Sequence, residues 1–446
     1  MATKTWIGNA HSVKQINTIT VANTWAAGDT ATCTINGKDL IVTCGSTTTT
    51  TATVATAIKE AWMSATRLDG TSSSSNATSN FGGQEFGEFS EVTASISGSV
   101  VTLIGNEAGN PFVVTVTENT AGTGTATGAA STVCTGNHYW DNADNWDTGT
   151  VPANDDIVVF RDSDVSCKFG LPNSDGATPL EVTIQQWMSY TGEVGLPAVN
   201  VNTVGKPYYE YRQRYIRLND AGTGTDIAHR FGLGKDGIGC RLFNLKHLTL
   251  KCSPIVYNTG PPLASRIGTK ALNICCTANT STLTIVNGSV EFSSQDSGTS
   301  AFVTVKQTAG DSRGVTAIHT TGGVVTINSG TMIVGGAGAI DTINCNGGTL
   351  RAENQTGTLS ILKNYTGGTV NWASAGTIST YYSFGGAFDA RESPGFTMTN
   401  GNLYKGSTFY DPMRTMTVGS AFYILYDPVN DLDFGSNELT SRVKVV

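Results

Sequence analysis

Charged side chains are scarce in this chain of 446 residues, and those present carry no excess of positive charge. Asp, Glu, Lys and Arg make up 14% of the residues, against about 25% in typical soluble domains. The formal net charge is −8, whereas proteins that coat nucleic acid need a Lys and Arg excess to neutralise phosphates. We therefore expect no nucleic acid among its partners.

Long apolar runs are also missing. No stretch of 18 or more apolar residues occurs, so the sequence predicts no membrane insertion. The opening segment MATKTWIGNA lacks the apolar centre of a secretory signal peptide. We expect a protein that stays in the cytoplasm where it is made, or that leaves by another route such as release in a virus particle.

Cysteine pairs with metal-binding spacing are missing as well. The nine cysteines are odd in number and none has CxxC spacing. Several lie in apolar, strand-like stretches, such as Cys275, Cys276 and Cys345. Because buried cysteine behaves as a small hydrophobe, we predict reduced core thiols rather than a disulfide framework or a zinc site.

Glycine, by contrast, is frequent, with 52 residues, and threonine is abundant. Threonine suits a half-buried pleated surface and glycine suits turns. Few stretches have a helical pattern. The composition predicts a mainly all-β protein.

A glycine-centred pattern recurs in the C-terminal third. Apolar residues stand five and three places before a glycine and two places after it. The copies are centred on Gly288, Gly330, Gly348 and Gly401, with a weaker one at Gly368 and another in which Thr308 takes the glycine position. Apolar residues two apart face one side of a strand, so each copy predicts strand, turn and strand. A period near 20 residues is typical of a β-solenoid.

The sequence divides into four regions. We predict an α+β anchoring module over 1–130, a β-rich connecting region over 131–240, a β-helix (solenoid) domain over 241–425 and a C-terminal tail over 426–446. In the first module, Asn36-Gly37 predicts a hairpin between strands at 30–35 and 40–44. A helix is expected over 52–66. The Gly/Ala/Thr-rich segment 120–131 is expected to be a linker.

Three aspartates between and beside two tryptophans are candidates for a calcium site. They are Asp141, Asp144 and Asp147. Calcium prefers several carboxylate and carbonyl oxygens as ligands. The alternative is a turn in which Trp140 and Trp146 cap the end of a β-stack while Asp and Asn side chains bind turn amides. We expect no other cofactor.

The densest aromatic and basic stretch lies within residues 206–217. Tyr and Arg are enriched at protein interfaces, which predicts a protein contact here. The alternative is an edge strand with alternating exposure. The interface candidates are Tyr208, Tyr209, Tyr211, Arg212, Arg214, Tyr215 and Arg217.

Motifs for catalysis are few, and we assign no catalytic residue. The string Gly232-x-Gly234-x-x-Gly237 lacks the preceding strand and following helix of a dinucleotide site. Only Glu291 and Asp311 lie one period of about 20 residues apart, as a polysaccharide-cleaving carboxyl pair would require. We interpret the two carboxylates as surface turn residues in preference to a catalytic pair.

Short phrases in the repeats resemble a known architecture. GlyGlyThrLeu at 347–350 and GlyGlyThrVal at 367–370 resemble the right-handed β-helix rungs of autotransporter passengers and phage tailspikes. The segment 140–159 looks like a lead-in found before such helices, and 26–38 with 54–62 is similar to small domains of phage virion proteins. The resemblance implies a right-handed β-helix on a non-enzymatic structural component of a phage particle, such as a head decoration, fibre or spike protein.

The resemblance also implies partners. Open solenoid ends and edges must be covered, so we expect self-association as a homotrimer, together with contacts to capsid or tail subunits in the virion. One alternative is a tailspike that binds or degrades a polysaccharide, with a host-surface glycan as partner. Another is a bacterial cell-surface adhesin or surface-layer protein.

Overall fold

The structure is a computed structural model and falls into two units. It describes residues 1–36, 38–45, 50–63, 75–79, 92–172, 180–195, 215–218, 226–247, 251–262, 270–276, 280–292, 302–314, 323–336, 338–425, 431–434 and 443–445. Residues 8–145 contribute one unit, and residues 1–7 join the described residues from Trp146 onward in the other. Within these ranges, every helix is too short or too polar to cross a membrane.

The unit of residues 8–145 contains two four-stranded antiparallel sheets and one helix. The first sheet has the order β6 (Val92–Ser97), β7 (Val100–Gly105), β2 (Ile16–Ala22) and β9 (Thr125–Thr132). The second has the order β5 (Ser75–Ser79), β4 (Lys38–Cys44), β3 (Thr30–Ile35) and β8 (Val114–Asn119). Ile35 pairs with Lys38 and Asn36 has φ 50°, which confirms the predicted hairpin.

The helix α1 (Thr51–Met63) begins close to its predicted start. Thr50 precedes it, and the Thr50 Oγ1 accepts a hydrogen bond from the Thr53 N–H at 3.2 Å, as a helix cap does. Val54, Ile58 and Trp62 are buried on one face, where they join the core of the two sheets. Their spacing of four residues puts them on the same side of the helix.

The segment that we expected to be a linker is a strand. β9 pairs with β2 in the antiparallel sense, from Ala22 opposite Thr125 to Ile16 opposite Thr132. It is an edge strand, and Ala126 is its only buried residue. A strand that buries so little lacks the alternating apolar pattern by which strands are recognised, so the linker prediction was wrong.

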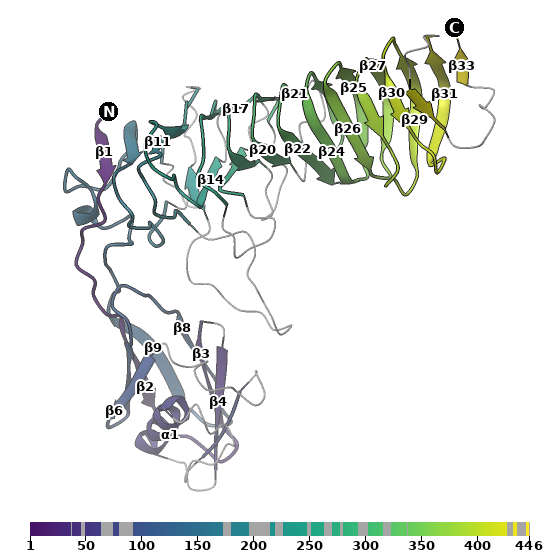
Figure 1. The fold of residues 1–446 in the computed structure, drawn as a ribbon. Coiled ribbons are helices and arrows are strands. Elements are labelled where there is room, and N and C mark those ends of the chain that lie inside the picture. Colours follow the sequence, from purple (N-terminus) through teal and green to yellow (C-terminus); the bar gives the residue numbers. More distant parts are fainter. Residues whose placement is uncertain are drawn as a thin grey trace. The chain divides into compact units, whose positions relative to one another are not determined.

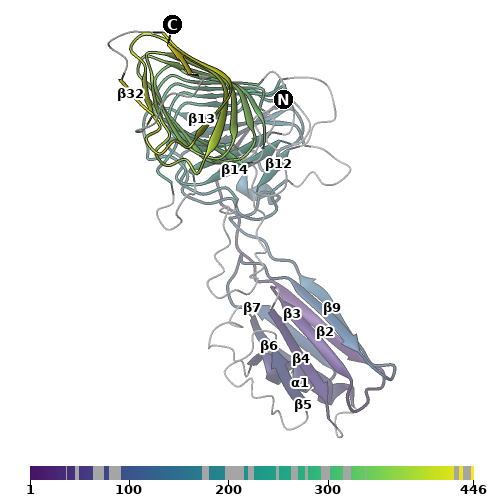
Figure 2. The same cartoon turned by 90° about the vertical axis from the view of Figure 1, so that its right-hand side faces the viewer.

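The other unit contains a C-terminal β-solenoid of about seven turns, which confirms the predicted fold class. Two parallel sheets run through this unit, and from Val182 onward successive strands alternate between them (Figures 1 and 2). The 14-stranded sheet contains β1 (Thr3–Trp6), β10 (Asp156–Phe160), β11 (Val182–Trp187), β13 (Arg230–Leu233), β15 (Ile255–Val256), β17 (Thr282–Ile285), β19 (Thr304–Gln307), β21 (Val324–Ile327), β23 (Ile340–Cys345), β25 (Thr358–Tyr365), β27 (Thr377–Phe384), β29 (Phe396–Leu403), β31 (Met416–Ile424) and β33 (Val443–Val445). The 11-stranded sheet contains β12 (Ile216–Leu218), β14 (Phe243–His247), β16 (Leu272–Cys276), β18 (Ser289–Glu291), β20 (Asp311–Gly314), β22 (Thr331–Gly336), β24 (Gly348–Gln355), β26 (Gly368–Ala373), β28 (Ala387–Asp389), β30 (Thr408–Tyr410) and β32 (Asp431–Asp433).

These strands begin earlier in the chain than the predicted domain boundaries imply. Thr3 pairs with Ile157 and Trp6 with Phe160, so β1 belongs to the solenoid and not to the N-terminal module. β10, β11 and β13 continue the same sheet through the region that we expected to be a connection over 131–240. Parallel pairing joins residues that are distant in sequence, and no local pattern marks it.

The solenoid core is built from side chains stacked in register. Leu283, Val305, Val325, Ile343 and Leu362 lie opposite one another on successive strands, and all five are fully buried. Each turn therefore completes the core of its neighbours, because a single turn cannot enclose its own apolar face.

Glycines with positive φ mark the turn between the two sheets, at Gly288, Gly310, Gly330, Gly348, Gly367, Gly385 and Gly406. The first four form a column at one register position, whereas Gly348 is opposite Gly368, so the last three lie one residue earlier in their turns. A Cβ atom at position 330 would lie 2.1 Å from the carbonyl oxygen of Gly310, and one at position 310 would lie 2.4 Å from that of Gly288. Glycine is required at these two positions both by the backbone conformation and by the close approach of the turns.

The column corrects two copies of the sequence pattern. Gln307 is opposite Ile285 and is fully buried, so it holds the interior position of this copy although it is polar. The turn glycine of the copy is therefore Gly310, two residues after the Thr308 that we had aligned. Gly401 lies within the strand β29, where a Cβ atom would lie 2.2 Å from the Phe422 ring. Gly406 is the turn glycine of that copy.

Candidate functional site

The outer face of the 11-stranded sheet brings polar side chains from three turns together. Arg351, Asn371 and Asp389 are register partners on β24, β26 and β28. The residue before each of them is fully buried in the core. Because side chains alternate along a strand, these three point outward.

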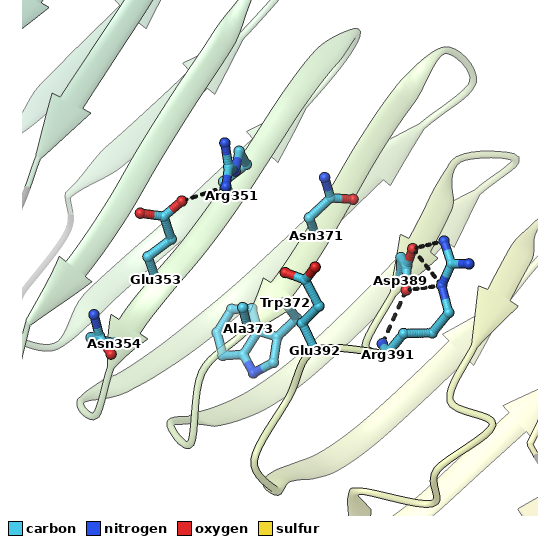
Figure 3. Close-up of a pocket in the computed structure, with 9 residues that line it drawn as sticks. All are labelled: Arg351, Glu353, Asn354, Asn371, Trp372, Ala373, Asp389, Arg391 and Glu392. Atoms are coloured by element: carbon cyan, nitrogen blue, oxygen red, sulfur yellow. Dashed lines mark hydrogen bonds and ion pairs between the residues drawn. The ribbon is translucent and has the colours of Figure 1, made fainter. Parts of the chain in front are cut away.

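These side chains line a hollow with a volume of about 790 Å³ (Figure 3). Its charged lining residues are Arg351, Glu353, Asp389, Arg391 and Glu392. The last two follow β28 in a turn, and Glu353 lies two residues beyond Arg351 on β24. The hollow therefore holds three carboxylates and two guanidinium groups.

Two ion pairs organise the hollow. Arg351 Nη2 lies 2.8 Å from Glu353 Oε1. Arg391 Nε donates to both carboxylate oxygens of Asp389 at 3.0 Å, and the Arg391 backbone N–H donates to Asp389 Oδ1 at 3.0 Å. Figure 3 shows the two pairs on either side of Asn371 and Glu392.

The ion pair between Asp389 and Arg391 keeps the Asp389 carboxylate ionised. Hydrogen bonds from the Arg391 guanidinium lower the pKa of the Asp389 carboxyl below its usual value. The proton donor in glycoside cleavage requires a carboxyl whose pKa is raised. Asp389 is thus suited to binding and not to proton donation.

The same arrangement continues into the next turn. Tyr410 is the register partner of Asp389, and the Arg391 Cζ atom lies 5.9 Å from the centre of its ring. The Tyr410 hydroxyl donates to Asp431, which raises the pKa of that phenol. Turns in such a stack repeat about every 4.8 Å. The row of amide, carboxylate and guanidinium groups fits hydrogen bonding to a ligand rich in hydroxyl groups.

The sequence contained a signal for this site that we did not use. Arg351, Asn371 and Asp389 each stand three places after a glycine, at Gly348, Gly368 and Gly386. Counting from these three glycines, which share one register position, would have placed them in one row. As isolated residues in a long sequence, they show no pattern typical of a site.

The three candidate calcium ligands are exposed and do not converge. Asp141, Asp144 and Asp147 do not form a group whose ligand atoms lie within 4.8 Å of one another. Asp147 Oδ1 instead accepts a hydrogen bond from the Thr5 N–H at 2.8 Å. A calcium site at these residues stays a prediction.

Trp146, which stands between Asp144 and Asp147, has the packing role that the turn alternative gave it. Trp146 is buried, with its ring 5.3 Å from Trp6 and 6.4 Å from Phe160. Trp6 ends β1, which is the terminal strand of the 14-stranded sheet. Trp146 therefore packs at one end of the stack.

Most of the aromatic and basic stretch lies outside the described residues, namely Tyr208, Tyr209, Tyr211, Arg212 and Arg214. Tyr215 is buried, and Arg217 is half-buried on β12. β12 is the terminal strand of the 11-stranded sheet, as the edge-strand alternative predicted. The interface prediction is untested for the other residues.

The carboxylate pair Glu291 and Asp311 does not share one register position. Glu291 is opposite Arg313, and Asp311 is opposite Ser289. Glu291 is buried, whereas Asp311 is exposed and forms an ion pair with Lys270. The pairing was wrong because it was counted from Thr308 and not from Gly310.

All nine cysteines lie in the described residues, where each is buried and none forms a disulfide. Burial raises the pKa of the Cys33 thiol to about 12, so this thiol stays protonated at neutral pH. Two of the other cysteines, Cys252 and Cys276, lie together with His247 as a group of potential metal ligands.

The chain matches no protein-family model, no curated protein and no solved structure.

Proposed function

We propose that this chain is a non-enzymatic structural component of a virus particle, such as a decoration, fibre or spike protein. The observation that carries the proposal is the continuous stack of two parallel sheets around one apolar core, a scaffold with a polar outer face. The resemblance of segments 347–350 and 367–370 to tailspike rungs supports a projecting role. The α+β unit of residues 8–145 would then be the attachment module.

Self-association as a homotrimer is part of this proposal. An aromatic column runs along the outside of the 14-stranded sheet near its C-terminal end. Phe384 stacks on Tyr365 at 5.1 Å and on Tyr404 at 4.8 Å between ring centres. The Phe384 side chain is still 36% exposed, and Leu425 beside this column is 39% exposed. Their exposed edges would fit an apolar surface on a second copy of the chain.

The particle assignment is tested on the particles themselves. Mass spectrometry of virus particles purified from cells that encode this chain should find it together with capsid or tail subunits. An antibody against the α+β unit should label the same particles in electron micrographs. Absence of the chain from purified particles would refute the assignment.

Binding of a polysaccharide is a second candidate function, and the hollow favours it. Arg351, Asn371, Asp389 and Arg391 offer hydrogen-bond donors and acceptors along three turns. In this case the solenoid would recognise a host-surface glycan.

A glycan array probed with the purified full chain tests the second candidate. Arg391→Ala should abolish binding, whereas Lys306→Ala, which removes one exposed positive charge from the other sheet, should leave it unchanged. Equal binding by both variants would exclude the hollow as the site. Release of new sugar ends from a bound polysaccharide would contradict the non-enzymatic assignment.

A further inference from the structure

Three potential metal ligands converge inside the solenoid core, away from the hollow. His247 on β14 and Cys276 on β16 are register partners, and Cys252 lies just before β15 in the opposite sheet. One imidazole nitrogen and the two sulfur atoms lie within 4.8 Å of one another. All three residues are at most 1% exposed.

This convergence differs from the packing of other buried cysteines. Cys240 Sγ donates to backbone carbonyls at 2.6 Å and 2.7 Å, and Cys345 Sγ lies 3.8–3.9 Å from three carbonyl oxygens. In the cluster, by contrast, the sulfur atoms of Cys252 and Cys276 lie within 4.8 Å of each other and of an imidazole nitrogen of His247.

We infer that His247, Cys252 and Cys276 form a buried binding site for Zn²⁺. Two thiolates neutralise one divalent cation, so the loaded site buries no net charge. With Zn–S near 2.3 Å and Zn–N near 2.0 Å, tetrahedral ligand atoms stand about 3.4–3.8 Å apart. The observed cluster needs only a small contraction to reach this spacing.

The neighbours of the cluster fit such a site. His229 is fully buried, with its ring centre 5.5 Å from that of His247. Its Nδ1 accepts a hydrogen bond from the Ile184 N–H at 3.1 Å, and its Nε2 has no hydrogen-bond partner. With Nδ1 as acceptor, the neutral ring carries its proton on Nε2. An unsatisfied buried N–H next to a thiolate site is the kind of outer-shell donor that metal sites use.

Ser281 adds a polar contact to the two sulfur ligands. Its Oγ lies 2.9 Å from Cys276 Sγ and accepts a hydrogen bond from the Cys252 N–H at 3.0 Å. It therefore holds the Cys252 backbone against the Cys276 side chain.

Metal bound here would cross-link the two sheets over neighbouring turns. Because the site is closed to solvent, the ion would enter as the chain folds.

The experiment begins with the full chain, purified under reducing conditions and analysed for metal. We expect about one Zn²⁺ per chain. The chain is then unfolded with a chelator and refolded with Co²⁺, which should produce thiolate-to-cobalt charge-transfer bands. Refolding without metal should lower the melting temperature of the solenoid relative to the zinc-loaded protein.

Matched variants separate this site from other thiols. Cys252→Ala and Cys276→Ala should each lose the cobalt bands. Cys345→Ala, in the core several turns away, and Cys275→Ala, next in sequence but facing the other way, should keep them. Circular dichroism confirms that each variant has folded, and a variant that has not folded is replaced by the corresponding serine variant.

Two results would overturn the inference. One is wild-type protein that contains no zinc and, when refolded with Co²⁺, gives no thiolate-to-cobalt bands. The other is a Cys252–Cys276 disulfide in the native protein, found by mass spectrometry after alkylation without reduction. Neither result bears on the particle assignment, which is judged from the composition of virus particles.

Discussion

Replacing Gly330 by alanine tests whether the glycine column limits the stability of the solenoid. Gly330 has φ +78°, and this left-handed conformation costs an alanine about 1–2 kcal/mol. The new Cβ atom would also lie 2.1 Å from the Gly310 oxygen, whereas ordinary contacts begin near 3.4 Å. Forcing neighbouring turns apart by about 1 Å is a form of overpacking, which costs about 1–3 kcal/mol. The expected total is about 2–5 kcal/mol.

Gly367→Ala is the matched control for this change. Gly367 has φ +91° in a later turn, one residue before the position opposite Gly348, and a Cβ atom there would meet nothing within 4 Å. It should therefore show only the conformational cost of about 1–2 kcal/mol. Any effect of glycine on the unfolded chain is the same for both variants and cancels in the comparison.

Hydrogen exchange measured by mass spectrometry is the suitable assay, because solenoids open locally. The Thr331 N–H donates to the Gly310 oxygen at 2.9 Å and the Thr349 N–H to the Gly330 oxygen at 2.7 Å, so both report on this turn. The protection of these two amides should fall at least about fivefold further in Gly330→Ala than that of the corresponding turn amides does in Gly367→Ala. Equal losses in the two variants would show that close stacking of the turns does not determine stability.

Three other predictions follow from described contacts. Gln307→Leu should destabilise the solenoid by about 1–3 kcal/mol in urea unfolding, because Gln307 Nε2 donates to three backbone carbonyls at 3.1–3.2 Å. The control is Ile327→Leu at its register partner, which should cost less than about 1.5 kcal/mol. No loss of stability in Gln307→Leu would contradict the role of these hydrogen bonds. The lowered pKa of Asp389 means that its stabilisation is complete above its unfolded value near 3.8 and is lost as pH falls further. Acid unfolding curves of wild type and Asp389→Asn should therefore converge below this pH, and a constant gap would refute the assignment. Phe384→Ser should reduce the mass measured by light scattering from three chains of 46.6 kDa toward one, whereas Tyr257→Ser, an exposed aromatic residue on another turn, should not.

The solenoid was predictable because its glycines obey two constraints that leave a mark in the sequence. Positive φ and close stacking allow only glycine at positions such as Gly330 and Gly348, so their spacing gives the period. The alignment of the repeats in the sequence failed where polar residues occupy interior positions. Gln307 and Asn364 are fully buried and donate to backbone carbonyls, and neither fits an apolar pattern.

The candidate site was not predicted, although its residues were visible. Glu353, Asp389 and Glu392 are far apart in the sequence. They come close only because β24, β26 and β28 pair side by side in the sheet. The His247, Cys252 and Cys276 group has the same origin. Its residues carry no CxxC spacing, since the stacking of strands and not a local loop brings them into contact.

The pairing of β1 with β10 sets an order of events during synthesis. Thr3 finds its partner Ile157 only after all of residues 8–145 have been made. Domains fold as units while the chain grows, so the α+β unit can be complete before the first strand is placed. Between the synthesis of β10 and the docking of β1, the outer edge of β10 is an open template on which a strand from another copy could pair. In the folded chain β1 covers this edge, but it can do so only late in synthesis. A high local concentration of nascent chains therefore favours strand exchange between copies at this edge.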